Sequence, residues 1–190
     1  MRKWLLAVAA LAVLLAGWHP APKEPEGLAL VRVLGVDGAG PVTLTAVCGG
    51  EDQEHNQSRG QCVGADFEEA LSAVSWSGEE ELSITSVTYL IVGREVELES
   101  VLLAALRNEK LGAAATVWLA EGGAAALLGS CVDPATALEL LERQGNEAPT
   151  VVEALAALYR GDELRLPLLT ARKNGLSQTG GREWGRVHEQ

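Results

Sequence analysis

The sequence predicts a mixed α/β fold, in which a mixed β-sheet opens with an antiparallel hairpin and is covered by helices. Short apolar and β-branched runs alternate along the chain with segments that carry apolar residues at helical spacing. The first two runs are joined across Asp37-Gly38, a strong turn signal, and therefore form a hairpin. The later strand–helix–strand units imply parallel pairing with right-handed crossovers.

Apolar or alternating runs mark the predicted strands. They are expected at residues 29–36, 42–47, 87–92, 115–120 and 164–169. Pro167 lies in the last of them and has no N–H to donate to a ladder, so this strand is expected at the edge of the sheet. Residues 49–64 are polar and contain several glycines, which predicts a loop.

Capping signals mark the ends of several predicted helices. Asp66 with Glu69, and Thr150 with Glu153, have the spacing of a capping box. Asp133 is followed by proline at the first helical position, and this helix should end at Gly145. The predicted helices cover residues 66–74, 95–106, 124–128, 133–144 and 150–160.

Composition limits the classes of function that need to be considered. The chain has 190 residues, of which 47% are hydrophobic, and its formal net charge is −11. This length suits one domain with a real core, and the apolar content excludes a disordered chain. A surface that binds nucleic acid needs clustered lysine and arginine to displace counterions. The acidic balance therefore predicts no nucleic-acid partner.

The N-terminus has the pattern of an export signal. Arg2 and Lys3 precede an apolar or small-residue stretch from Trp4 to Trp18. Residues 1–18 are therefore expected to be a signal peptide or an uncleaved signal anchor. Residues 19–27 contain three prolines and are expected to form an extended tether. The domain that follows is expected outside the membrane.

No common catalytic motif is found in the sequence. It lacks GxSxG, P-loop, GxGxxG, HExxH and CxxC patterns. His19, His55 and His188 lie in the predicted tether, a polar loop and the C-terminus, where a general base would have no fixed partner to orient it. The sequence therefore predicts a protein that is not an enzyme and that uses no cofactor.

Cys48 and Cys62 bracket 13 polar residues in a chain that is expected to be exported. A disulfide that closes this loop is the favoured interpretation. Two reduced thiols are the first alternative. The second is a metal site formed by Cys48, His55 and Cys62, although structural zinc sites usually have closely paired ligands, which this segment lacks. No metal ligand is assigned.

Several segments, taken in order, resemble a known family. They are LVRVLGVDG (30–38), VTLTAV (42–47), GADFEEAL (64–71), SVTYLIVGREV (86–96), LLAALRNEKLGAAATVWLAEGGAAALL (102–128) and LPLL (166–169). This order is similar to the N-terminal domain of the Ger(x)C family, the C-subunits of spore germinant receptors. The resemblance implies a sheet-and-helix domain at residues 28–170, followed by a polar C-terminal tail at 171–190.

The resemblance also carries expectations about function. Family members usually open with Gly-Cys-Trp, whereas here Gly17 is followed directly by Trp18, and they continue into further domains. The chain therefore resembles a truncated member without the lipid-bearing cysteine. The resemblance implies an exported, membrane-proximal protein in spore germination or sporulation, anchored or secreted at the outer face of the cytoplasmic (spore inner) membrane.

The implied partners are membrane-embedded germinant receptor subunits or related membrane proteins. They would bind an exposed apolar patch on the helices or the strand edge at Pro167. The alternative function is an exported protein that binds a small ligand or metal, or an enzyme, and uses the acidic loop between Cys48 and Cys62.

Overall fold

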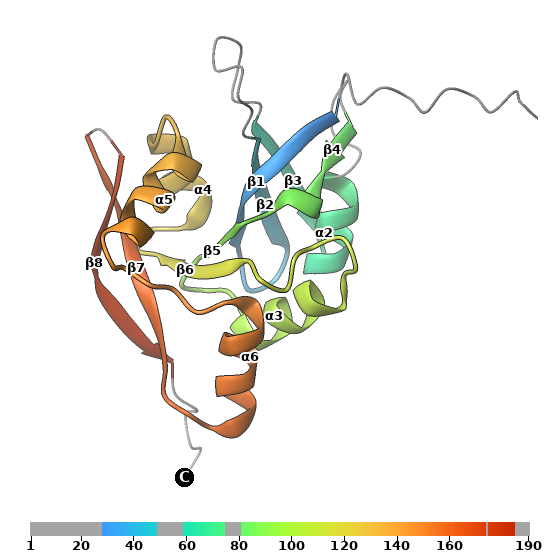
Figure 1. Cartoon of the computed structure of the whole chain (residues 1–190). Helices are drawn as coiled ribbons and strands as arrows, with labels where there is room; N and C mark the ends of the chain where they lie inside the picture. Colours follow the sequence, from blue (N-terminus) through green and yellow to red (C-terminus); the bar gives the residue numbers. More distant parts are fainter. Residues whose placement is uncertain (1–27, 49–58, 75–80, 174, 185–190) are drawn as a thin grey trace, which may run out of the picture.

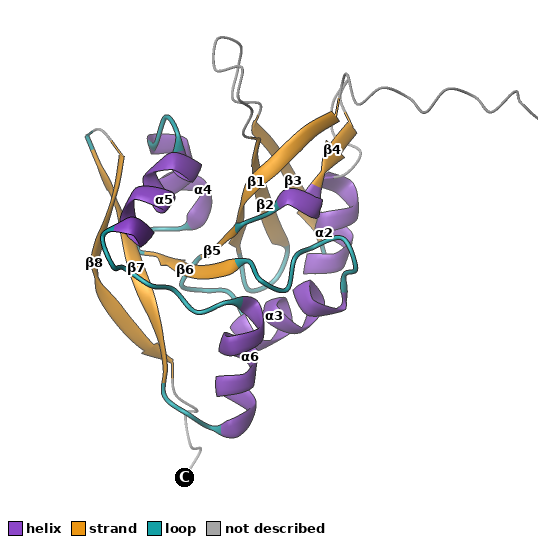
Figure 2. Ribbon diagram, in the orientation of Figure 1, coloured by secondary structure: helices purple, strands orange, loops and turns teal. Residues whose placement is uncertain are grey.

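The computed structural model describes residues 28–48, 59–74, 81–173 and 175–184 (Figure 1). Helices lie on both faces of one central mixed sheet (Figure 2), which confirms the predicted fold class. The strands are β1 (Leu28–Asp37), β2 (Val42–Cys48), β3 (Arg59–Gly64), β4 (Glu81–Ser83), β5 (Tyr89–Val92), β6 (Thr116–Ala120), β7 (Leu164–Arg172) and β8 (Gly175–Trp184). The helices are α2 (Phe67–Val74), the 3₁₀ turn η1 (Ile84–Ser86), α3 (Leu98–Arg107), α4 (Ala124–Ser130), α5 (Pro134–Arg143) and α6 (Val151–Arg160).

The sheet has the strand order β3-β2-β1-β5-β6-β7-β8, and β4 pairs with the start of β1. Strands β1 and β2 form the predicted antiparallel hairpin, with Asp37 opposite Thr43. Gly38 lies in the turn with a φ of 97°, a conformation that residues with a side chain rarely adopt. Strands β1, β5, β6 and β7 are parallel neighbours, as the strand–helix–strand units predict.

Two apolar cores lie on opposite faces of this sheet. Helices α2, α3 and α6 cover one core, and α4 and α5 cover the other. Each central strand contributes to both: in β6, Val117 and Leu119 enter the first core, whereas Trp118 and Ala120 enter the second. Strands that are apolar on both faces are typical of parallel sheets covered on both sides.

The predicted helix caps are confirmed. Thr150 Oγ1 accepts a hydrogen bond from the Glu153 N–H, and the Glu153 carboxylate accepts one from the Thr150 N–H. The α6 helix ends at Gly161 in the left-handed conformation. Asp133 caps α5, which ends at Arg143. At the start of α2, Asp66 accepts a hydrogen bond from the Glu69 N–H, whereas the Glu69 carboxylate accepts one from the N–H of Ala65, so this predicted capping box is formed only in part.

Part of the predicted loop at residues 49–64 is a strand. Residues 59–64 form β3, which pairs antiparallel with β2, whereas residues 49–58 lie outside the described residues. In β3 the side chains of Arg59, Gln61 and Val63 are exposed, so the strand lacks the apolar pattern of a buried one. Its position is also supported by Arg59, whose guanidinium donates to the carbonyl oxygens of Gly129 and Cys131 at the end of α4.

The prediction for the C-terminal strand was wrong in two respects. Strand β7 is not at the edge, because it pairs with β6 on one side and with β8 on the other. Residues 175–184 are not a tail but the edge strand β8, so the domain extends beyond residue 170. Pro167 is buried and pairs with Gly181, next to a register shift between Pro167 and Leu169, and irregularities of this kind are among the places where a sheet accommodates proline.

Candidate functional site

The strand register places Cys48 and Cys62 too far apart for the predicted disulfide. Cys62 lies opposite Leu44, and Cys48 lies four residues further along β2. At about 3.3 Å per residue this separates the two cysteines by about 13 Å along the strand. A disulfide requires Cα atoms within about 7 Å of each other. The structure therefore corrects this prediction, and no disulfide joins the two residues.

The alternative metal site at this loop is not brought together by the described residues. Within them, no group of three histidine, cysteine, aspartate or glutamate side chains is placed to hold a metal ion. His55 and the acidic residues between the two cysteines lie outside the described part of the chain, as do His19 and His188. Residues 1–18 and 19–27, the predicted signal segment and tether, also lie outside it.

Among the described helices, none is by itself long and apolar enough to cross a membrane. Helices α4 and α5, which are bent by 96° relative to each other, satisfy the length and composition of a broken span when taken together.

Asp37 occupies the edge of the sheet where the parallel strands end. Ligands of α/β proteins often bind at this edge. Here the Asp37 carboxylate accepts hydrogen bonds from the N–H groups of Ala124 and Ala125, both at 2.7 Å, and so caps α4. A Cβ at Gly93 would collide with Asp37 Oδ1, so the neighbouring turn must stay small. The sequence analysis assigned Asp37 only to a turn.

A second polar cluster lies between the sheet and α5. Tyr89 Oη donates to Glu142 Oε2 at 3.3 Å, and Thr116 Oγ1 donates to Glu142 Oε1 at 3.2 Å. Trp118 Nε1 donates to Thr116 Oγ1 at 3.0 Å. Burial, together with the Glu142 carboxylate, raises the pKa of Tyr89 to about 12. Tyr89 therefore remains a neutral donor, and the cluster holds α5 against the sheet.

The α6 helix exposes two large apolar side chains. Val152 and Tyr159 are 45% and 58% exposed, and their spacing of seven residues places them on the same face of the helix. The buried face of α6 is formed by Val151, Ala154 and Leu155. Helix α3 packs against α6 and also exposes Leu106. From the apolar residues alone, the sequence predicts Val152 and Tyr159 on the buried face of this helix together with Val151 and Leu155, and this prediction is wrong because both side chains are exposed.

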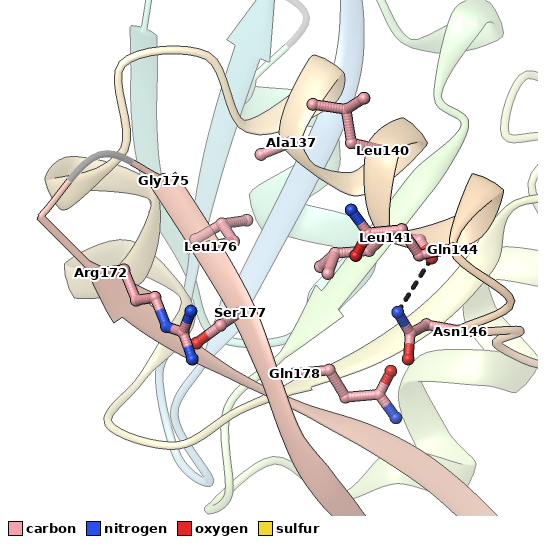
Figure 3. Close-up of a pocket in the computed structure, with 10 residues that line it drawn as sticks. All are labelled: Ala137, Leu140, Leu141, Gln144, Asn146, Arg172, Gly175, Leu176, Ser177 and Gln178. Carbon is pink, nitrogen blue, oxygen red and sulfur yellow. Dashed lines mark hydrogen bonds between the residues drawn. The ribbon is translucent and has the colours of Figure 1, made fainter.

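A pocket of about 370 Å³ lies between α5 and the β7–β8 hairpin (Figure 3). One side is formed by α5 and the loop that follows it, and the other by the end of β7 and by β8. The residues that line it are Ala137, Leu140, Leu141, Gln144, Asn146, Arg172, Gly175, Leu176, Ser177 and Gln178. Sequence reasoning missed this site because half of it comes from the segment predicted to be a tail.

Comparisons with known proteins gave one similarity. A search against protein-family models found no match, and a search of curated proteins also found none. Among solved structures, the chain is similar to one described as the crystal structure of the GerBC protein, with 13% sequence identity and a TM-score of 0.41. The similarity covers 81% of this chain and 48% of that one, so this chain spans about half the length of the protein it matches.

Proposed function

We propose that this protein is a non-enzymatic, exported and membrane-proximal interaction module that acts in spore germination or sporulation. The support is the order of the segments that resemble the first domain of Ger(x)C subunits. Residues 30–38 and 42–47 contain most of β1 and most of β2, and residues 64–71 contain the start of α2. Residues 86–96 contain β5, and residues 102–128 span most of α3, all of β6 and most of α4.

The outward face of α6 is the proposed contact surface for a membrane-embedded germinant receptor subunit or a related membrane protein. The observation that carries this assignment is the exposure of Val152 and Tyr159. Aromatic side chains are enriched in the centres of protein interfaces. Solvent-facing positions of a surface helix are usually polar, so two large apolar side chains on one such face favour a protein contact.

A charge placed on this face tests the proposed contact. We expect Tyr159→Glu and Val152→Glu each to abolish co-purification with membrane-embedded receptor subunits from membranes that contain both proteins. Val132→Glu is the matched control, because Val132 is 84% exposed and lies in the connection between α4 and α5. Unchanged co-purification by the α6 variants, at unchanged thermal stability, would refute the assignment of this face.

Export and location need a separate experiment. We expect the domain to be digested by a protease added outside intact protoplasts, and the N-terminal segment to direct it there. The intact mass of the recovered protein distinguishes a cleaved signal peptide from an uncleaved anchor. Spores that lack the protein should show altered germination or altered sporulation yield, and normal values for both would refute the proposed process.

A further inference from the structure

The pocket between α5 and β8 lies on the opposite face of the sheet from α6, because α5 covers the second core and α6 the first. A ligand bound there is therefore separate from the proposed protein contact. The volume of about 370 Å³ lies within the range of pockets that bind small molecules. The side chains on its two walls decide which chemistry it accepts.

One face of α5 forms the first wall. Ala137, Leu140, Leu141 and Gln144 follow the i, i+3, i+4, i+7 spacing that places side chains on one face of a helix. Leu140 is 50% exposed, so this wall includes apolar surface that the described protein does not cover. Leu176 faces the same wall from β8 (Figure 3). The three leucines therefore offer an apolar surface to a bound molecule.

The strand register shows which side chains of the β7–β8 hairpin face α5. Leu169 belongs to the second core and pairs with Gln178, and Leu176 packs against the same core. Because side chains alternate along a strand, Leu176 and Gln178 share the face that is turned toward α5. Thr170 and Ser177 lie on the other face, where their hydroxyl oxygens are 2.9 Å apart. The second wall is therefore formed by Leu176 and Gln178.

The charge of the hairpin lies away from this wall. Arg172 follows Thr170 by two residues, so it belongs to the face opposite to Gln178. Figure 3 shows Arg172 and Gln178 at opposite ends of the pocket. The guanidinium therefore contributes to the edge of the pocket, and a small ligand between α5 and Gln178 does not depend on it.

The acidic residues of α5 are also engaged elsewhere. Glu142 accepts hydrogen bonds from Tyr89 and Thr116. Glu139 pairs with Arg143. Neither glutamate lines the pocket. Among the described residues, the two walls therefore carry no ionic group, despite the acidic composition of the chain.

Three carboxamide side chains supply the polar groups of the walls. Asn146 Nδ2 donates to the carbonyl oxygen of Leu141 at 3.0 Å, so Asn146 lies against the C-terminal end of α5. Gln178 Nε2 donates to the carbonyl oxygen of Gly180 at 3.1 Å. The third side chain, Gln144, forms no hydrogen bond within the described part of the chain. Its amide is therefore available both to donate and to accept.

The hydrogen bonds of Asn146 and Gln178 leave their amide oxygens as acceptors. The reverse orientation of either amide would bring two oxygens together, so each orientation is fixed. Gln178 Oε1 is buried and accepts no hydrogen bond from the described residues, which is costly for a polar atom. In Figure 3 the oxygens of both amides point into the space between the end of α5 and β8. This end of the pocket therefore favours a ligand that brings N–H donors.

We propose that this pocket binds a small neutral molecule that carries an apolar group and a primary carboxamide. An N–H group of the ligand donates to Asn146 Oδ1, its carbonyl oxygen accepts from Gln144 Nε2, and the apolar group lies against the three leucines. Asn146 adjoins Leu141, so the polar and apolar contacts lie next to each other. A charged ligand would lose water without gaining an opposite charge on either wall. No bond is made or broken in this binding, and the site succeeds or fails independently of the α6 contact.

Four probes with the same phenyl body test the recognition by ligand-observed NMR titration of the full chain. The primary amide, 3-phenylpropanamide, should bind saturably with a Kd below about 5 mM. Its N,N-dimethyl derivative has no N–H and should bind about five-fold more weakly. The cation 3-phenylpropylamine and the anion 3-phenylpropionate should each bind at least about ten-fold more weakly than the primary amide.

Variants assign the polar part of the binding to this pocket. Asn146→Ala removes the acceptor and should abolish the advantage of the primary amide over its dimethyl derivative. Asn108→Ala is the matched control, because Asn108 follows α3 on the opposite face of the sheet and accepts a hydrogen bond from the Lys110 N–H at 2.9 Å. It should leave the binding of all four probes unchanged.

A second pair of variants tests the apolar part. Leu140→Ala changes an already exposed side chain, so folding should be retained, and it should weaken both neutral amides by about five-fold. Leu106→Ala is the matched control, because Leu106 is 41% exposed on α3 and lies far from the pocket across the sheet. It should leave binding unchanged.

Three results would overturn the proposal. The first is the absence of saturable binding of the primary amide up to about 20 mM. The second is that the dimethyl derivative or either charged probe binds as tightly as the primary amide. The third is that Asn146→Ala and Leu140→Ala, folded as judged by thermal unfolding, bind the primary amide like the unaltered chain.

Discussion

At the residue scale, Asp37 joins two elements that are far apart in the sequence. Asp37 is the last residue of β1. Its carboxylate accepts hydrogen bonds of 2.7 Å from the N–H groups of Ala124 and Ala125, in the first turn of α4. Gly123, the residue at the N-cap position of α4, has no side chain that could replace these bonds. A carboxylate at a helix N-terminus is further favoured by the helix dipole.

We therefore expect Asp37→Ala to lower the free energy of unfolding by about 3 kcal/mol, because two charge-assisted hydrogen bonds are lost at a half-buried site. Urea denaturation measures this difference. Asp133→Ala, which removes an ordinary N-cap bond of 3.1 Å from α5, should cost only about 1 kcal/mol. Equal losses for the two variants would show that Asp37 is no more than a common helix cap.

Tyr89 makes the stability of the folded protein depend on pH in the alkaline range. Its folded-state pKa is raised to about 12, above the usual value of 10.0, chiefly by burial and then by Glu142. The folded state therefore holds the phenol proton more tightly than the unfolded state does. This contribution to stability is fully present below pH 10 and is lost as the pH rises through about 12.

We expect the stability difference between the unaltered chain and Tyr89→Phe to shrink between pH 10 and pH 12. Phenylalanine keeps the ring in the core but has no proton to lose, and other groups that titrate in this range cancel in the difference. Urea midpoints of both proteins, measured at intervals from pH 8 to pH 12, provide the test. A difference that stays constant or grows over this range would contradict the assigned pKa direction.

Residue-level predictions from the sequence succeeded where the signal is local. The caps at Asp66, Asp133 and Thr150 depend on residues within three positions, so their spacing can be read directly from the sequence. The role of Asp37 depends on α4, which begins 87 positions later. The separation of Cys48 from Cys62 depends on the β2–β3 register, which loop length does not determine.

At the element scale, β8 shows how tertiary pairing overrides a weak local signal. Its sequence, GLSQTGGREW, contains three glycines and few apolar residues, which resembles a loop or tail. It is nevertheless held along its length by the ladder to β7, from the Leu164–Trp184 pair to the Arg172–Gly175 pair. Half of the candidate pocket was therefore beyond sequence reasoning, since β8 provides Leu176 and Gln178.

Removal of β8 should destabilise the protein strongly. In a chain that ends at Arg172, β7 loses the whole of this ladder, and the buried residue Leu169 loses its neighbour across the strands. We expect this chain to be largely insoluble or to unfold at a lower urea concentration. A chain that ends at Trp184 is the matched control and should keep the original midpoint. Similar midpoints for both truncated chains would mean that β8 contributes little to folding.

At the scale of the whole molecule, the fold class could be predicted but the layering could not. The alternation of strands with helices predicts a mixed sheet covered by helices. Helical spacing shows that α3 and α5 each have an apolar face, but the same pattern arises on either side of a sheet. Which helices share a core follows from the order and direction of the strands, and this order depends on contacts between distant segments.

The two cores should unfold together, because β1, β5, β6 and β7 contribute side chains to both. We expect residues 28–184, produced without the segments that flank them, to unfold in one cooperative transition. With Trp76→Phe and Trp184→Phe, Trp118 is the remaining tryptophan of this piece, and it is fully buried in the second core. Its fluorescence should change at the same urea concentration as the far-ultraviolet circular dichroism, which follows the helices on both faces. If the fluorescence changed first, the core beneath α4 and α5 would be a separate and weaker unit, and the shared strands would not couple the two faces.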